Sequence, residues 1–506
     1  MGRSERLDRS DGGTDVPVLR AAPWGGGVVN VAIVNPPRFD GDSVVREERC
    51  EVVERYSVLE PYSLLQLASL LLAEGHRVRL LDANGENATF PEVESWLRSA
   101  PYDALILRFT PTTFDHDLRV AALSKRIHPE ARTIGICWTL RTMPTEVLRE
   151  ALPLDIYLRH EYESVGPPLI NALEDGGRLD LVPGIAYREN SHVAVTDNAR
   201  PIADYDAIPL PAYQLLDSLD PYFISAPACR PFTILYASKG CPFACSFCTV
   251  AKTAWKYRSA DSVLEELGHL RDHYRIRTVS FFDETFTMNK KRVRELCEGI
   301  RRERIDIRWY CNTRVHLVDP DLLRTMRSAG CSGISFGVES GNQQILNSVS
   351  KQATVAQAEQ AIRWAKEAHI KTYCAFILGL PGETGETAMD TIRFALRTLP
   401  NGAQFNVLAP YPGTELYETL QASGALPDIN WRGLYQDSAV VGTDGLSKAE
   451  LNRLRKLAYT KLYFSPRWWW QNLRSALESR DDFELASRYG LRVLSNYFVH
   501  GMQGSH

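Results

Sequence analysis

Runs of apolar residues alternate with amphipathic segments in two long blocks of this 506-residue chain. In the first block, short apolar runs have the length of strands, and the segments between them have helical periodicity. The expected strands are 28–34, 77–83, 104–109, 133–138 and 155–160, and the expected helices are 61–73, 91–99, 114–127 and 144–151. Strands this apolar, separated by helices, predict a doubly wound parallel sheet over residues 28–175.

The alternation of strand and helix patterns stops between residues 176 and 230. Alternating residues on either side of Asn190-Ser191 predict a hairpin of strands 184–189 and 192–196. Ile208-Pro209-Leu210-Pro211 then predicts an extended linker, because a proline disfavours helix at the residue before it. We therefore expect residues 176–230 to separate two domains.

A second alternating block covers residues 231–424. Its expected strands are 233–238, 278–283, 307–313, 333–340, 371–379 and 403–411. Six such units are too few for a complete eight-stranded barrel. Residues 425–506 have mainly helical patterns, whereas residues 1–27 are polar and glycine-rich and predict a disordered leader.

Composition narrows the classes of partner. The net charge of −4 gives no indication of nucleic acid or of an anionic membrane as a partner. No apolar run reaches the length of a membrane-spanning helix, and no signal peptide is evident. Ten cysteines without framework spacing indicate a reducing compartment. We expect a cytoplasmic protein.

The most specific motif is a cysteine loop that follows the expected strand 233–238. Cys241, Cys245 and Cys248 have the spacing C-x3-C-x2-C. Thiolates are the usual ligands of iron–sulfur clusters, which take four, so three leave one iron open to a small molecule. Structural zinc needs a fourth ligand, usually from a second pair of cysteines, and none lies nearby in the sequence.

With Phe247 directly before the last cysteine, this loop resembles that of the radical SAM superfamily. The resemblance implies a four-iron four-sulfur cluster that binds S-adenosylmethionine (SAM) and cleaves it to methionine and a 5′-deoxyadenosyl radical. It also implies a partial (β/α)6 TIM-type barrel over residues 231–424. An external electron donor of the flavodoxin or ferredoxin type is expected with it.

Carboxylates follow two of the barrel strands and are candidate SAM ligands. Asp283-Glu284 occupies the place of an acidic loop in the family, and we favour Glu284 as the partner of the SAM amine. A helix cap around Asp283 is the structural alternative. Glu339-Ser340 lies between glycines and suits the two ribose hydroxyls. A buried, unpaired Glu339 would be costly, which favours a functional role.

Two further positions complete the expected SAM site, which also includes Phe247. Gly379 opens a glycine-rich turn that could present backbone groups to adenine, or could simply lead into a helix capped by Thr384. Arg314, at the end of the third strand, could pair with the methionine carboxylate or form an ordinary ion pair.

A doubly wound, Rossmann-like domain before such a barrel resembles the cobalamin-dependent (class B) radical SAM methyltransferases, over residues 28–424. Asn35-Pro36-Pro37 and Pro209 to Tyr213 fit that pattern, but the cobalt-ligating Asp-x-His-x-x-Gly motif is absent. The expected cobalamin contacts are Pro36, Thr110, Thr112, Thr113, Gly135 and Trp138. Trp138 could cover the lower cobalt face or lie in the core, and the three threonines could bind the nucleotide tail or cap a helix.

The resemblance implies a C-methyltransferase that uses SAM, the cluster and cobalamin. A methyl group would pass to an unactivated carbon of a small molecule, as in antibiotic biosynthesis, for example to a heteroaromatic ring such as a pyrrole. A cobalamin-dependent cyclase, oxidase or rearrangement enzyme is the alternative. A methylthiotransferase is disfavoured, since only scattered cysteines precede residue 241 and the chain is not basic.

Overall fold

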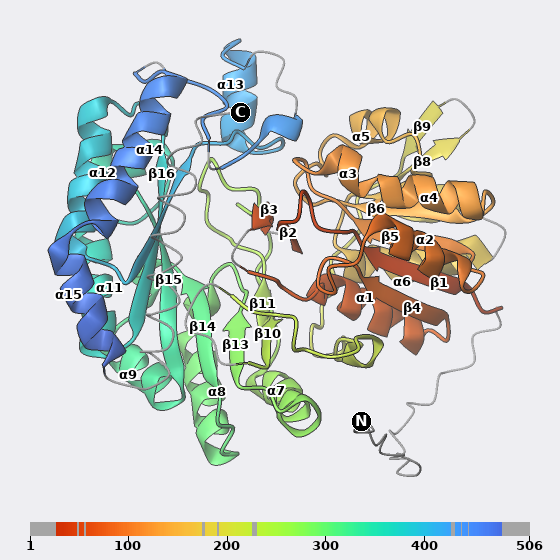
Figure 1. The fold of residues 1–506 in the computed structure, drawn as a ribbon, viewed down its shortest axis with the longest axis horizontal. Helices are drawn as coiled ribbons and strands as arrows, with labels where there is room; N and C mark the ends of the chain where they lie inside the picture. The colour runs from red at the N-terminus through yellow and green to blue at the C-terminus, as the bar shows by residue number, and fades with distance from the viewer. Residues whose placement is uncertain are drawn as a thin grey trace, which may run out of the picture.

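The computed structural model describes residues 27–47, 50–54, 57–174, 178–189, 192–224, 230–426, 431–436, 438–443 and 445–477. These residues form two α/β units that lie side by side (Figure 1). The expected leader lies outside the described residues except for Gly27, as does the end of the expected helical carboxyl-terminal region, 478–506. None of the described helices is long and apolar enough to cross a membrane.

The first unit is built on a seven-stranded sheet with the order β4-β1-β5-β6-β7-β8-β9. Its parallel strands are β1 (Asn30–Asn35), β4 (Arg77–Asp82), β5 (Ala104–Arg108), β6 (Arg132–Ile136) and β7 (Ile156–Leu158). Along β1, Val31 and Ile33 enter one core, whereas Ala32 and Val34 enter the other. Burial on both faces explains the continuous apolar runs of these strands.

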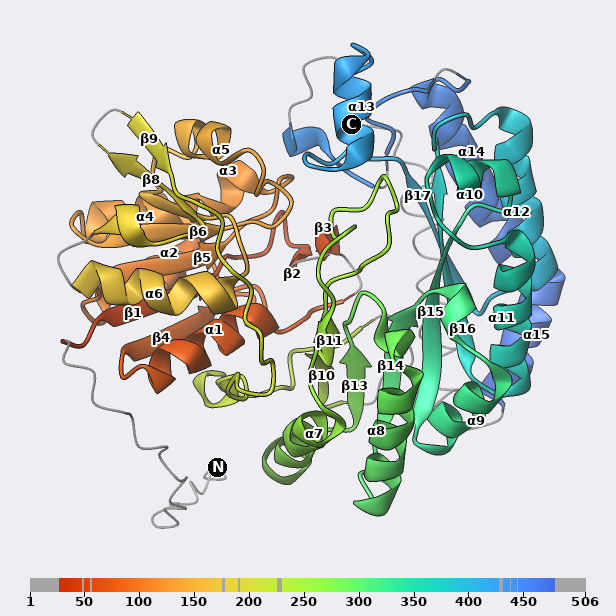
Figure 2. The same cartoon turned by 180° about the vertical axis from the view of Figure 1, so that it is seen from behind.

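Helices cover both faces of this sheet (Figures 1 and 2). One core includes residues of α1 (Tyr62–Ala73) and α6 (Tyr162–Glu174), which pack together. The other includes residues of α2 (Phe90–Arg98), α3 (Phe114–Asp117), α4 (Arg119–Ile127) and α5 (Pro144–Glu150). The predicted doubly wound sheet is therefore confirmed.

Two hairpins differ from the expected organisation. Strands β8 (Ile185–Glu189) and β9 (His192–Val195) form the predicted hairpin, but they pair with β7 and extend the first sheet. The first unit therefore continues past residue 175. A second hairpin, β2 (Ser43–Glu47) and β3 (Cys50–Glu54), was not expected and lies between the two units (Figures 1 and 2).

The second unit contains six parallel strands in the order β10-β13-β14-β15-β16-β17. They are β10 (Phe232–Leu235), β13 (Thr278–Phe281), β14 (Arg308–Thr313), β15 (Cys331–Glu339), β16 (Lys371–Leu378) and β17 (Gly402–Val407). No pairing between the described residues of β10 and β17 closes the sheet. The predicted partial barrel is confirmed.

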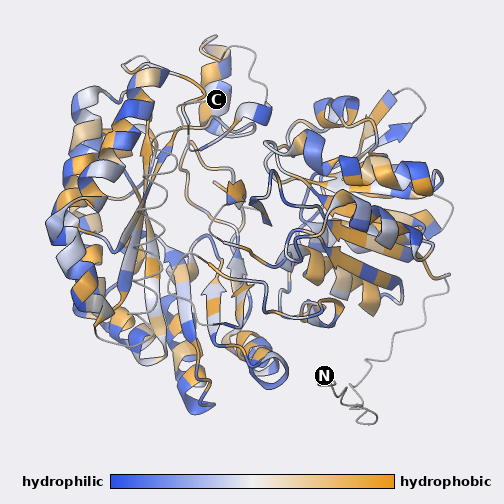
Figure 3. Ribbon diagram, viewed as in Figure 1, coloured by the Kyte–Doolittle hydropathy of each residue, from blue (hydrophilic) through white to orange (hydrophobic). Residues whose placement is uncertain are grey.

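An outer layer of helices surrounds the barrel (Figure 2). The helices of the second unit are α7 (Ala260–Tyr274), α8 (Lys290–Arg302), α9 (Pro320–Ser328), α10 (Gln343–Ser348), α11 (Val355–Glu367), α12 (Gly385–Thr398), α13 (Glu415–Ala422), α14 (Lys448–Tyr463) and α15 (Pro466–Ala476). Polar residues predominate on the outward sides of the helices, and apolar residues predominate toward the sheets (Figure 3). In α15, Trp468 is buried, but Trp470 is 70% exposed.

Candidate active site

The three cysteines lie in one loop, residues 240–255, which we call the cluster loop. It connects two short antiparallel strands, β11 (Ser238–Lys239) and β12 (Lys256–Tyr257). Its backbone bonds to itself: Cys241 N donates to Thr253 Oγ1 at 2.9 Å, and Thr253 N donates to Cys241 O at 3.1 Å. Cys248 N donates to Cys245 O at 3.1 Å. The loop therefore holds its shape through contacts within the protein.

Gly240 makes the turn into this loop possible. Its φ is +85°, a region that favours glycine, and a Cβ atom there would lie 2.1 Å from Ala254 O. Gly240 N donates to Glu284 Oε2 at 3.0 Å. Only glycine fits this position without moving the backbone on the other side of the loop.

Burial affects the protonation of two of the three thiols. Burial raises the pKa of Cys248 to about 12 and also raises the pKa of Cys241, so ligation by iron must displace their protons. Among the described residues, no three His, Cys, Asp or Glu side chains meet where they could hold one ion. A cluster does not need such convergence, because each thiolate binds a different iron.

The structure gives different surroundings to Asp283 and Glu284. Asp283 is fully buried and accepts hydrogen bonds from Ala237 N at 2.9 Å and from Ser238 Oγ at 2.5 Å. It thus fixes the segment that leads into the cluster loop. Glu284 is half-buried and reaches the loop itself at Gly240. Glu284 thus contacts the turn into the cluster loop, and its role toward a ligand stays a prediction.

A chain of polar contacts joins the cysteines to Glu339. Arg314 Nη1 donates to Cys245 Sγ at 3.2 Å, and Arg314 Nη2 donates to Lys351 O. Lys351 Nζ forms an ion pair of 2.6 Å with Glu339 Oε1. Gly337 makes room for this pair, because a Cβ there would lie 2.5 Å from Glu339 Oε1. Glu339 is therefore buried but paired, so the expectation of an unpaired carboxylate was wrong and its role toward SAM stays a prediction. No local sequence signal identified Lys351 as its partner.

Ser340 and Gly379 serve the framework in this structure. The Ser340 hydroxyl lies 3.1 Å from Thr391 Oγ1 and accepts from Asn342 N, so it does not point to Glu339. Gly379 has φ +88°, and its N–H donates to Glu383, whose pKa burial raises to about 7. Thr384 caps α12, as the structural alternative predicted. Phe247 packs on an apolar cluster of Ile345, Val349, Leu380, Leu408 and Leu416.

The expected cobalamin contacts lie at or beside the carboxyl ends of β1, β5 and β6. Thr110 and Thr113 are buried, and their hydroxyls lie 2.9 Å apart. Thr113 Oγ1 also donates to Asp117 Oδ2 at 2.5 Å, and Thr112 Oγ1 lies 3.2 Å from Thr110 Oγ1. A Cβ at Gly135 would lie 2.6 Å from Leu154 Cδ1, so core packing already accounts for this glycine.

The β2–β3 hairpin covers the same edge of the sheet. Glu51 accepts from Trp138 N at 2.8 Å and from Thr139 N at 3.0 Å, and pairs with Arg108 at 3.3 Å. Arg46 donates to Pro36 O at 3.0 Å and pairs with Asp117 at 2.6 Å. The hairpin therefore bonds to the backbone of two of the expected cobalamin residues, Pro36 and Trp138, a role that the sequence did not indicate.

A cavity of about 390 Å³ lies where the first unit meets the cluster loop. Trp138, Arg141 and His160 line it from the first unit, and Thr253 and Lys256 line it from the second. The indole Nε1 of Trp138 is buried without a hydrogen-bond partner among the described residues. An orphaned donor beside this cavity fits the amide-rich rim of a corrin, although the cavity alone is small for a whole cobalamin.

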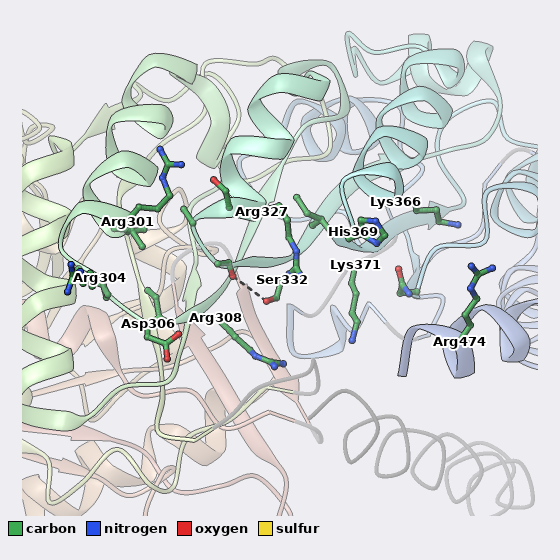
Figure 4. A pocket seen from close by; sticks show the side chains of 18 of the residues that line it. Arg301, Arg304, Asp306, Arg308, Arg327, Ser332, Lys366, His369, Lys371 and Arg474 are labelled. Carbon is green, nitrogen blue, oxygen red and sulfur yellow. Dashed lines mark hydrogen bonds between the residues drawn. The ribbon is translucent and has the colours of Figure 1, made fainter. Parts of the chain in front are cut away.

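A larger cavity of about 950 Å³ lies at the opposite end of the barrel (Figure 4). It is lined by the starts of β14, β15 and β16, and many of its side chains are basic. The nine residues of β15 separate it from Glu339 by roughly 26 Å at about 3.3 Å per residue. This cavity is therefore too distant to take part in chemistry at the cluster loop.

Comparison with known proteins identifies the family. Residues 235–395 match the model of the radical SAM superfamily. An uncharacterized methyltransferase of Pyrococcus horikoshii is 31% identical over 405 residues, which cover 79% of this chain and 87% of that protein. The chain belongs to the radical SAM superfamily. The resemblance inferred from the cysteine loop is confirmed.

Two comparisons place this radical SAM enzyme more closely. The anaerobic magnesium-protoporphyrin IX monomethyl ester cyclase of Rubrivivax gelatinosus is 31% identical over 366 residues, or 70% of this chain and 65% of that protein. The cobalamin-dependent enzyme OxsB has a TM-score of 0.69, with 16% identity over 93% of this chain and 72% of OxsB. TsrM of Kitasatospora setae has a TM-score of 0.68, with 16% identity over 87% and 90% of the two chains. The radical SAM enzyme thus has their two-domain fold.

Proposed function

We propose that this radical SAM enzyme is a cobalamin-dependent C-methyltransferase. The observation that carries the proposal is the position of the cluster loop. Glu284 and Arg314 approach it from the barrel, and Trp138 and Arg141 approach it from the carboxyl edge of the other sheet. Ligands of doubly wound sheets and of barrels bind at these carboxyl ends. Two cofactors held there would lie on either side of one shared space.

Different side chains of the second unit would bind the cluster and SAM. Cys241, Cys245 and Cys248 would hold the cluster, with the Arg314 guanidinium stabilising the Cys245 thiolate. Glu284 would accept hydrogen bonds from the SAM ammonium group, and Glu339 would accept them from the ribose. When bound, the cluster supplies the electron that cleaves SAM, and cobalamin supplies the methyl group. We propose a flavodoxin-type or ferredoxin-type protein as the source of that electron.

The first unit would hold cobalamin at the carboxyl edge of its sheet. At this edge the Arg141 guanidinium lies over the Trp138 ring at 4.4 Å, and the Thr110 and Thr113 hydroxyls bond to each other, 2.9 Å apart. Such an edge can cover one face of a corrin while bonding its amides. The hairpin above it would exclude water from the space between the units.

We propose a small-molecule substrate with a heteroaromatic group. TsrM, which has the same fold, has been solved with a tryptophan substrate, and an indole is such a group. Other relatives are methyltransferases named for different substrates: a hopanoid C-3 methylase of Methylococcus capsulatus and a cytidylyl-2-hydroxyethylphosphonate methyltransferase of Streptomyces wedmorensis. Methyl transfer is therefore proposed separately from the heteroaromatic substrate.

A cyclase is the second candidate, because the magnesium-protoporphyrin cyclase is also 31% identical, although over a smaller share of this chain than the methyltransferase (70% against 79%). Product stoichiometry distinguishes the two. A methyltransferase forms one S-adenosylhomocysteine and one 5′-deoxyadenosine for each methylated product. Formation of 5′-deoxyadenosine with product but without S-adenosylhomocysteine would favour the cyclase.

A further inference from the structure

The two strands that close the cluster loop place like charges opposite each other. Lys239 of β11 and Lys256 of β12 are direct cross-strand partners. Directly opposed residues of an antiparallel pair share one face, where like charges destabilise the pairing. Neither side chain escapes to solvent, because their exposed fractions are 4% and 11%. The base of the loop is therefore stable only if negative charge is supplied from elsewhere.

That charge comes from the other unit. Glu163, in the first turn of α6, forms a buried ion pair with Lys239, and Glu161, directly before α6, binds Lys256 through both carboxylate oxygens. Lys239 Nζ also donates to Tyr162 OH at 2.7 Å. A further cross-unit bond runs from Arg141 Nη2 to Thr249 O inside the loop, at 2.7 Å.

We propose that Glu161 and Glu163 are positioning residues that lock the cluster loop to the cobalamin-binding unit. The strand pair carries the two lysines and the start of α6 carries the two glutamates, so the ion pairs form in the relative placement of the units that the structure shows. Buried charges are well suited to such a registry role, because a shifted arrangement leaves them unpaired. The pairs thereby set the separation of the cluster and the corrin, on which the reacting geometry depends.

This inference rests on the proposed function, and the separation can be measured directly. In holoenzyme with a reduced cluster and cob(II)alamin, both centres carry an unpaired electron, so pulsed dipolar EPR reports their distance. We expect one narrow distance in the wild type. E163Q, E161Q and the double variant should give a broader or longer distribution, with the largest change in the double variant.

The chain offers a matched control. Glu415 pairs with Lys252 of the same loop at 2.7 Å, but this pair is exposed and lies within the second unit. E415Q removes the same charge near the cluster and should leave the distance unchanged. Wild-type distance distributions in both E161Q and the double variant would overturn the proposal. A lower melting temperature alone would not support it, because a purely structural role of the glutamates would also lower the melting temperature.

Amide hydrogen exchange separates this inference from the proposed function. If the wild type binds no corrin, the proposed function fails, but exchange in the apoprotein still reports the lock. Exchange of residues 240–255 should become at least tenfold faster in the double variant than in E415Q. Equal rates in the two variants would overturn the lock without bearing on the reaction.

Discussion

At the scale of single residues, neighbouring side chains with the same chemistry have different tasks. Asp283 is committed to Ala237 and Ser238, so Glu284 is left to approach the cluster loop. Glu339 holds Lys351, whereas the Ser340 hydroxyl turns to Thr391. Sequence adjacency therefore does not imply a shared role at either position.

Replacement of Cys245 tests the cluster at this scale. In Cys245→Ala one of three protein ligands is lost, and Arg314 loses the sulfur to which it donates. We expect loss of bound iron and of reductive SAM cleavage, with corrinoid binding intact. Iron and sulfide analysis, product chromatography and the visible spectrum measure these properties. Full SAM cleavage by the variant would remove Cys245 from the proposed ligand set.

Replacement of Glu339 tests the SAM site. Loss of a charge-assisted hydrogen bond costs about 1.5–3 kcal/mol, so Glu339→Gln should weaken SAM binding by roughly 10- to 150-fold. Ser340→Ala is the matched control and should bind SAM as the wild type does, because its hydroxyl serves Thr391. Anaerobic equilibrium dialysis measures both. Equal affinities of the two variants would contradict the assignment of Glu339.

At the scale of elements, the junction of α1 and β10 carries a titratable group. Glu60, just before α1, is fully buried and accepts from Thr233 Oγ1 and Ile234 N of β10. Burial raises its pKa from 4.5 to about 8. The folded chain then keeps a proton that the unfolded chain releases above about pH 4.5, so this group makes stability fall as pH rises through about 8.

Glu60→Gln removes this titration and keeps one acceptor oxygen. We expect the melting temperature of the wild type to fall by a few degrees more than that of the variant between about pH 5 and 9, at roughly 1 °C per kcal/mol for a chain of 506 residues. Calorimetry over this range is the measurement. Parallel curves for the two proteins would mean that Glu60 does not titrate in this window.

Sequence patterns predicted the elements that local rules determine. Strands β1 and β5 of the first sheet are buried along almost their whole length, and the three cysteines lie within one short segment, so both could be recognised from the sequence. The β2–β3 hairpin could not, because its charged residues Arg46 and Glu51 find their partners only across the folded sheet. Lys351 and Glu163 were missed for the same reason, since their partners are remote in sequence or in another unit.

At the scale of the whole molecule, the two ends of the barrel should be functionally independent. Arg304 and Arg327 line the basic cavity at the strand starts (Figure 4). Replacing both with alanine should leave the rate of SAM cleavage within about twofold of wild type, because residues at this face of a barrel serve stability. A large loss of SAM cleavage, with cluster content unchanged, would contradict this separation.

The proposed function depends on a cluster with one iron that the three cysteines leave open to SAM. The most direct measurement is the EPR spectrum of the anaerobically reconstituted and reduced full chain, recorded with and without SAM. We predict the signal of a reduced four-iron four-sulfur cluster whose g values shift when SAM is added. Zinc in place of iron, or an iron signal that SAM does not change, would contradict the account.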